Sequence, residues 1–152
     1  MASLTVFRGA AVWSFLAAGI ACWPAAAAAG DFDKNRNMLC ALGEAFECTK
    51  GQSCERVLPA EIGAPHFFRI DVANRVAQGV GPGAPGRKSP IASLSEVGGM
   101  LVLQGVDEER EGERGAVGWN ASVSPDDGGM VLTAAAAEGT AFVVFGDCLN
   151  DQ

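Results

Sequence analysis

The feature that most constrains the fold of this chain is an alternation of apolar and polar residues that recurs from Met38 onward. It is clearest in the segment 117–123, where the apolar positions are Val117, Trp119, Ala121 and Val123. A period of two indicates a β-strand with one buried face, because a helix would need a period near 3.6. Turn-forming residues interrupt the pattern about every eight to twelve positions, which is typical of an all-β domain.

Eight or nine strands are therefore expected, in simple antiparallel succession. The clearest of them are residues 67–72, 75–78, 91–96, 100–106, 117–123, 130–135 and 140–148. Residues 38–47 would tolerate a helical turn as readily as a strand. The run 142–145 is apolar at every position, and such a run predicts burial on both faces of its strand.

Four cysteines follow the first 29 residues, and their even number favours a disulfide framework formed in an oxidising compartment. Cys48 and Cys54 flank a glycine-containing turn that would bring their strands together, which leaves Cys40 to pair with Cys148. In the chain-entropy model the long bridge contributes about 4 to 5 kcal/mol and the short one about 2 kcal/mol. The spacings do not match the paired ligands of a zinc site, and no Cys-x-x-Cys redox motif is present.

A bridge between the first and last strands favours a closed meander, because closure removes exposed strand edges. We predict a small antiparallel up-and-down barrel of about eight strands, stabilised by disulfides, with a two-sheet β-sandwich as the alternative. Residues 38–152 suit a single domain. Two loops are expected within it: a flexible Gly/Pro loop at 79–88, whose composition disfavours a ladder, and an acidic loop at 107–115.

Residues 1–29 have the features of a secretory signal peptide, since Arg8 precedes an apolar run and an alanine-rich tail follows it. We expect cleavage between Ala29 and Gly30, followed by a frayed segment over residues 30–37. The expected location is the periplasm or the exterior, with a lipoprotein anchored at Cys22 as a minor alternative. The apolar run is shorter than the roughly 20 residues of a spanning helix, so no transmembrane segment is expected in the mature chain.

Charge and motifs narrow the classes of function. Removal of Arg8 leaves ten basic against eighteen acidic residues, a net charge of −8 that disfavours a nucleic-acid partner. The chain lacks a nucleophile elbow, a phosphate loop and a metal-binding His-Glu-x-x-His helix. We therefore predict no catalytic residue, no cofactor and no metal. The weak candidates for a surface site are His66, Arg69 and Asp71, which we expect to share one strand end.

The segments 68–71, 101–106, 118–119 and 142–148 together resemble a group of small uncharacterised secreted bacterial proteins, β-rich and without a known activity. In size and presumed topology the chain is also similar to periplasmic barrel inhibitors of lysozymes and proteases, a likeness of fold alone. Neither resemblance carries over a functional residue.

These observations favour an exported, non-enzymatic protein that binds a partner. An eight-stranded barrel has room for one small apolar ligand in its interior, and its loops offer a surface for an envelope protein. The alternatives are an inhibitor of a periplasmic lysozyme or protease and, last, an enzyme of unknown type, because no nucleophile and base are recognisable in the sequence.

Overall fold

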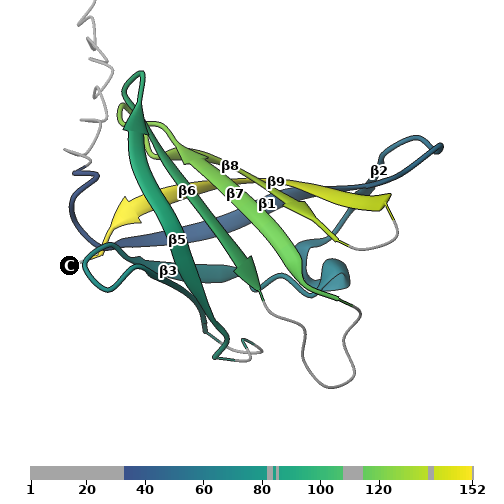
Figure 1. The fold of residues 1–152 in the computed structure, drawn as a ribbon, viewed down its shortest axis with the longest axis horizontal. Helices are drawn as coiled ribbons and strands as arrows, with labels where there is room; N and C mark the ends of the chain where they lie inside the picture. The colour runs from purple at the N-terminus through teal and green to yellow at the C-terminus, as the bar shows by residue number, and fades with distance from the viewer. Residues whose placement is uncertain (1–32, 82–83, 85, 108–114, 137–138, 152) are drawn as a thin grey trace, which may run out of the picture.

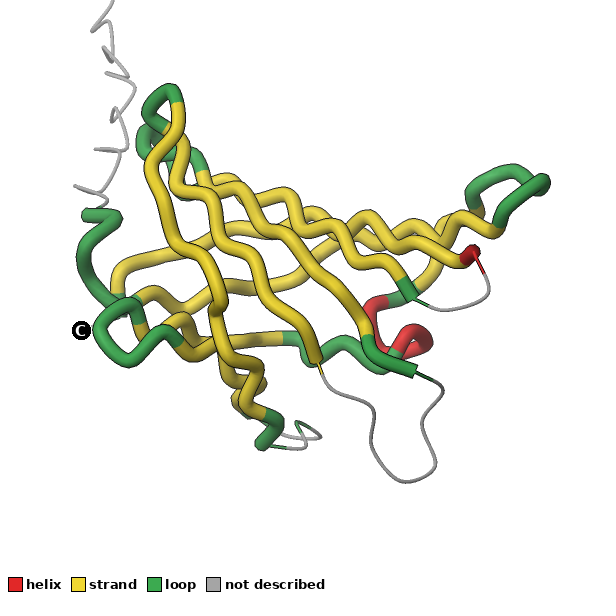
Figure 2. Tube along the Cα trace, viewed as in Figure 1, coloured by secondary structure: helices red, strands yellow, loops and turns green. Residues whose placement is uncertain are grey.

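The computed structural model describes residues 33–81, 84, 86–107, 115–136 and 139–151, and within them nine antiparallel strands are joined by turns that include the short 3-10 helix η1 (Figures 1 and 2). The elements are β1 (Met38–Thr49), β2 (Glu55–Val57), η1 (Pro59–Ile62), β3 (Phe67–Asp71), β4 (Val76–Val80), β5 (Lys88–Val97), β6 (Met100–Asp107), β7 (Val117–Val123), β8 (Gly129–Ala135) and β9 (Thr140–Asn150).

Eight of the strands close into a barrel, because β9 pairs with β1 along its whole length. The other edge of β1 is shared: β3 pairs with residues 38–41, and β2 pairs with residues 45–47 outside the ring. In Figure 1, β5, β6 and β7 run steeply while β1 and β9 run nearly horizontally, as expected when a twisted sheet curls on itself. The predicted barrel of about eight strands is confirmed, and the sandwich is excluded.

Strand β1 resolves the segment that the sequence left open between helix and strand. Its register against β9 shifts between Leu42 and Glu44, and such a bulge changes which residues of a strand face inward. Ala45, beyond the bulge, is fully buried. The close approach of the two strands requires glycine at Gly146, since a Cβ there would lie 2.2 Å from the carbonyl oxygen of Ala41.

The barrel interior is closely packed at the end where β1 begins and β9 ends. The residues that fill this packed end include Met38, Cys40, Ile70, Leu101, Val123, Met130 and Cys148. Cys40 and Cys148 lie directly opposite each other on β1 and β9 and form a disulfide with no exposed surface. The predicted bridge between the first and last strands is thus confirmed, and it lies inside the barrel.

The second predicted disulfide, Cys48–Cys54, is also confirmed. It closes the turn between β1 and β2, in the hairpin that projects from the barrel at the right of Figure 1. Cys54 is exposed. The two bridges therefore differ in environment, since one is sealed in the core and the other faces solvent.

The prediction that the run 142–145 is buried on both faces is wrong. Val144 is buried inside the barrel, whereas Phe145 is 42 % exposed on the outer surface. There the ring of Phe145 packs edge-on against Phe46, with ring centroids 6.2 Å apart. A barrel wall is a single layer with the interior on one side and solvent on the other, so its strands have one buried face each.

Two loop predictions also need correction. The segment predicted to fray is anchored over its described part: the backbone of Asp33 exchanges two hydrogen bonds of 2.7 Å with the side chain of Asn150. The predicted loop 79–88 is shorter, because Gly79 and Val80 belong to β4 and Lys88 begins β5. Residues 1–32 and 108–114, which include the predicted signal peptide and most of the acidic loop, lie outside the described residues.

Candidate functional site

The opposite end of the barrel interior contains a cavity of about 210 Å³. All eight strands of the ring contribute to its wall, together with the connection from η1 to β3. Most of the side chains that line it are apolar, and they include Leu42, Phe68, Leu103, Val117, Leu132 and Phe142. This arrangement follows from the alternation along each strand, which places every second side chain inside.

One wall of the cavity is built by Trp119 on β7. Its indole N–H donates a 2.7 Å hydrogen bond to Ser89 Oγ on β5, and β6 lies between these two strands. The indole spans β6 at Gly105, the register partner of Trp119, where a Cβ would lie 2.3 Å from the ring. Glycine at this position therefore gives the indole the space to lie against the barrel wall.

Polar groups gather where β5 begins and β6 ends. Arg87 Nη1 lies 3.6 Å from Asp107 Oδ2, and the two side chains are 29 % and 25 % exposed. Ser89, also in the cavity wall, is the buried polar residue of the described part of the chain, with 8 % exposed surface. We refer to Arg87, Ser89 and Asp107 as the rim. The cavity thus combines an apolar body with a small polar edge, as is usual in sites for small molecules.

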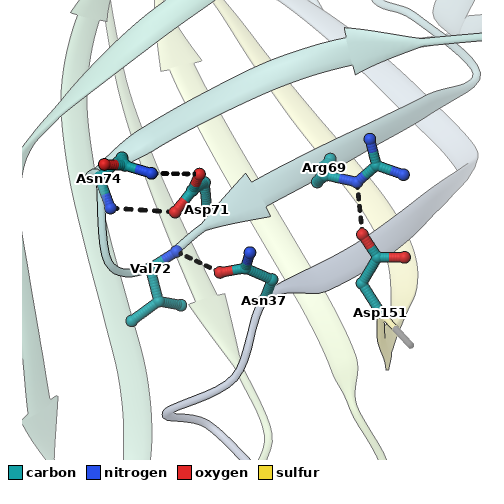
Figure 3. A network of polar contacts seen from close by, with 6 residues as sticks. All are labelled: Asn37, Arg69, Asp71, Val72, Asn74 and Asp151. Carbon is teal, nitrogen blue, oxygen red and sulfur yellow. Dashed lines mark hydrogen bonds and ion pairs between the residues drawn. The ribbon is translucent and has the colours of Figure 1, made fainter.

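The three surface candidates from the sequence do not share a strand end. His66 precedes β3, and its backbone carbonyl accepts a 2.9 Å hydrogen bond from the Leu42 amide. Arg69 forms an ion pair with Asp151 (Figure 3). Asp71 ends β3, at the opposite end of the strand from His66. None of the three contributes to the cavity wall as described.

Asp71 has a structural role in the turn that follows β3. Its carboxylate accepts hydrogen bonds of 2.9 and 2.7 Å from the backbone amide and the side-chain amide of Asn74 (Figure 3). These bonds, the one from the side chain first, hold the pKa of Asp71 below its usual range. The stabilisation is therefore present above the pKa of the unfolded chain and is lost as the pH falls through the folded value.

Replacing Asn74 with alanine is expected to raise the pKa of Asp71 towards its usual value, because the side-chain donor is removed. An NMR titration of the carboxyl carbons measures this shift directly. Asp127 is an internal control, since its pKa is lowered by hydrogen bonds from Ser124 and Gly129 in a different turn. An unchanged titration of Asp71 in the Asn74→Ala variant would refute the assignment.

Sequence reasoning assigned Trp119 to the core and overlooked the rim. Ser89 and Ile91 are alternate residues of β5, and Asp107 continues the inward series of Leu101 and Leu103 on β6. A polar residue at an inward position near a strand end was the available signal. Such a residue can be recognised as inward-facing only when the register of the strands is known.

Fold and cavity together define a small disulfide-bonded β-barrel with an apolar interior cavity. No family model matches the chain, and searches of curated proteins and of solved structures found no match. In the described part of the chain, no helix is long and apolar enough to cross a membrane. Within the same residues, no group of three or more His, Cys, Asp or Glu side chains is placed to hold a metal ion.

Proposed function

We propose that this protein is an exported, non-enzymatic binding protein that takes a small, mainly apolar molecule into the cavity of its barrel. The observation that carries this proposal is the apolar cavity of about 210 Å³ beside a closely packed core. An apolar cavity of about 150 Å³ in a protein core binds benzene. The larger volume here suits a short alkyl chain or a substituted ring.

The framework of the cavity supports the same function. Its wall is made of strands whose ladder closes on itself, so the site is formed before the ligand arrives and little ordering is needed on binding. Two disulfides suit a compartment outside the reducing cytosol. Export is also what the expected signal peptide and the resemblance to secreted bacterial proteins imply.

Octanol is a suitable first probe, because it is neutral and its chain matches an apolar cavity. Tryptophan occurs in this chain only at positions 13, 23 and 119. We expect octanol to change the fluorescence of Trp119 in a saturable manner, and we expect no such change in the Trp119→Phe variant. Native mass spectrometry of the exported protein, purified without reductant, would then show the bound molecule and any natural ligand.

Filling the cavity should abolish this binding. Ala134 lies in the cavity wall and is half-buried, so Ala134→Leu is expected to weaken octanol binding at least about tenfold, since a larger side chain occupies ligand volume. The matched control is Ala135→Leu, because Ala135 is the next residue of β8 and is exposed on the other face. Equal affinity in the two variants, or no octanol binding in the unmodified protein, would contradict the proposal.

A second candidate is protein binding through the outer surface, which the observed apolar side chains favour. Val131 and Phe145 are register partners on β8 and β9 and are 39 % and 42 % exposed. Inhibition of a lysozyme or protease is the form of this function that the fold-level resemblance suggests. Inhibition assays on both enzyme types, with Phe145→Ser as the surface variant and Ala134→Leu as the cavity variant, separate the two functions.

A further inference from the structure

We infer that the molecule in the cavity presents a carbonyl oxygen to the hydroxyl of Ser89, which makes it an uncharged ketone, aldehyde or ester with an apolar chain. This inference rests on the proposed function and adds the polar group of the ligand. The observations that carry it are the burial of Ser89, its position in the cavity wall and the hydrogen bond that it already accepts.

Ser89 lies on the inner face of β5. It is two positions before Ile91, a residue of the packed core, and its register partner on β4 is Ala77, which packs against the same core. Successive side chains of a strand alternate between its faces, so Ser89 and Ile91 share the inner one. Ser89 is 8 % exposed and contributes to the cavity wall. Its hydroxyl is therefore a polar group in a mainly apolar interior.

The hydroxyl of Ser89 makes one hydrogen bond and has the capacity for another. Its Oγ accepts the indole N–H of Trp119 at 2.7 Å, and a hydroxyl that accepts one bond still has its own hydrogen to donate. No acceptor in the described part of the chain takes this hydrogen. A buried donor without an acceptor has a free-energy cost, and the bond from Trp119 makes this O–H a stronger donor. An acceptor oxygen on a ligand in the cavity would remove that cost.

A carbonyl oxygen suits this position better than other polar groups do. It accepts the hydrogen of Ser89 and brings none of its own, whereas a hydroxyl or an amine brings a donor that then needs a partner. A charged group is disfavoured, because an unpaired charge is costly in an apolar cavity and Arg87 in the cavity wall is already in an ion pair with Asp107. The rest of the ligand meets apolar side chains such as Phe68 and Leu103.

The test compares 2-octanone with 2-methyl-1-octene, which keeps the shape but has a methylene group in place of the carbonyl oxygen. The affinity of each is measured by Trp119 fluorescence in the unmodified protein and in Ser89→Ala. We expect Ser89→Ala to weaken ketone binding about fivefold, the contribution of one neutral hydrogen bond, and to leave alkene binding within about twofold. Comparing the two ratios cancels the difference in hydration between the probes.

Infrared spectroscopy of bound 2-octanone reports the hydrogen bond directly, because accepting such a bond lowers the stretching frequency of a carbonyl group. In the unmodified protein we expect the band below its position in hexane, and in Ser89→Ala we expect it to return towards that position. A displaced indole is controlled for by comparing Trp119→Phe with the double variant Trp119→Phe, Ser89→Ala. Only the first of these keeps the hydroxyl, so the same difference in the band is expected between them.

A band at its hexane position in the unmodified protein, or a lowered band that persists in Ser89→Ala, would overturn this inference. Equal losses of ketone and alkene binding in Ser89→Ala would also overturn it. In each of these cases, binding of the alkene to the unmodified protein leaves the proposed function standing. Failure of the ketone, the alkene and octanol to bind the unmodified protein would instead overturn the proposed function.

Discussion

Replacing Gly105 with alanine is expected to lower the free energy of unfolding by about 3 kcal/mol, at the upper end of the usual range for an overpacked core. The added Cβ would lie 2.3 Å from the Trp119 ring and 2.5 Å from the carbonyl oxygen of Pro90. The ring can move, but the Pro90 oxygen belongs to the backbone of β5. Relief therefore requires a displacement of the ladder between β5 and β6.

A matched glycine on the neighbouring strand provides the control. Gly118, in β7, has no atom within 4 Å of the position that a Cβ would occupy, so Gly118→Ala should leave stability within about 0.5 kcal/mol of the starting value. Urea unfolding followed by circular dichroism measures both variants. We also expect Gly105→Ala to change the fluorescence of Trp119 and to weaken octanol binding. Similar stabilities for the two variants would disprove the role assigned to Gly105.

Removing the buried bridge is expected to have the largest effect of all. The double variant Cys40→Ala, Cys148→Ala should lose about 4 to 5 kcal/mol, because this disulfide closes the longer loop of the unfolded chain. Its cysteines are 108 positions apart in the sequence and join the strands at which the barrel closes. Both side chains are fully buried, so their truncation also leaves unfilled volume in the packed end.

The exposed bridge is the natural comparison. The double variant Cys48→Ala, Cys54→Ala should lose about 2 kcal/mol, since it opens a short loop, with a sequence separation of 6. Urea unfolding without reductant gives both values. Mild reductant applied to the folded protein, followed by alkylation and peptide mapping, should label Cys48 and Cys54 before the buried pair. Equal losses in the two variants, or first labelling of Cys40, would contradict this account.

The parts of the fold that could be predicted from the sequence are those set by local pattern. Strand β7 matches its predicted limits because one alternating run, ending at Val123, is followed directly by a turn rich in Asp and Gly. The disulfide pairing was predictable for a similar reason, since Cys48 and Cys54 lie across a short turn and only one further pair remains.

Other parts depend on contacts between distant segments. The bulge after Leu42 interrupts the alternation of β1, and its position depends on the register against β9. The exposure of Phe145 depends on whether a second layer covers the strand, which its own neighbours in the sequence do not reveal. The rim likewise joins Arg87 and Asp107 from opposite sides of a hairpin. Sequence reasoning could therefore predict an interior cavity but none of its polar residues.

The hydrogen bonds between Asp33 and Asn150 hold the two ends of the described chain together, beside the packed end of the barrel (Figure 1). The rim lies at the other end, where β6 ends and β5 begins. A tether that continues from Asp33 or Asn150 would therefore leave the molecule on the side away from the rim. Held on a membrane, a cell wall or a sensor chip in this way, the barrel would turn its rim towards the surrounding medium.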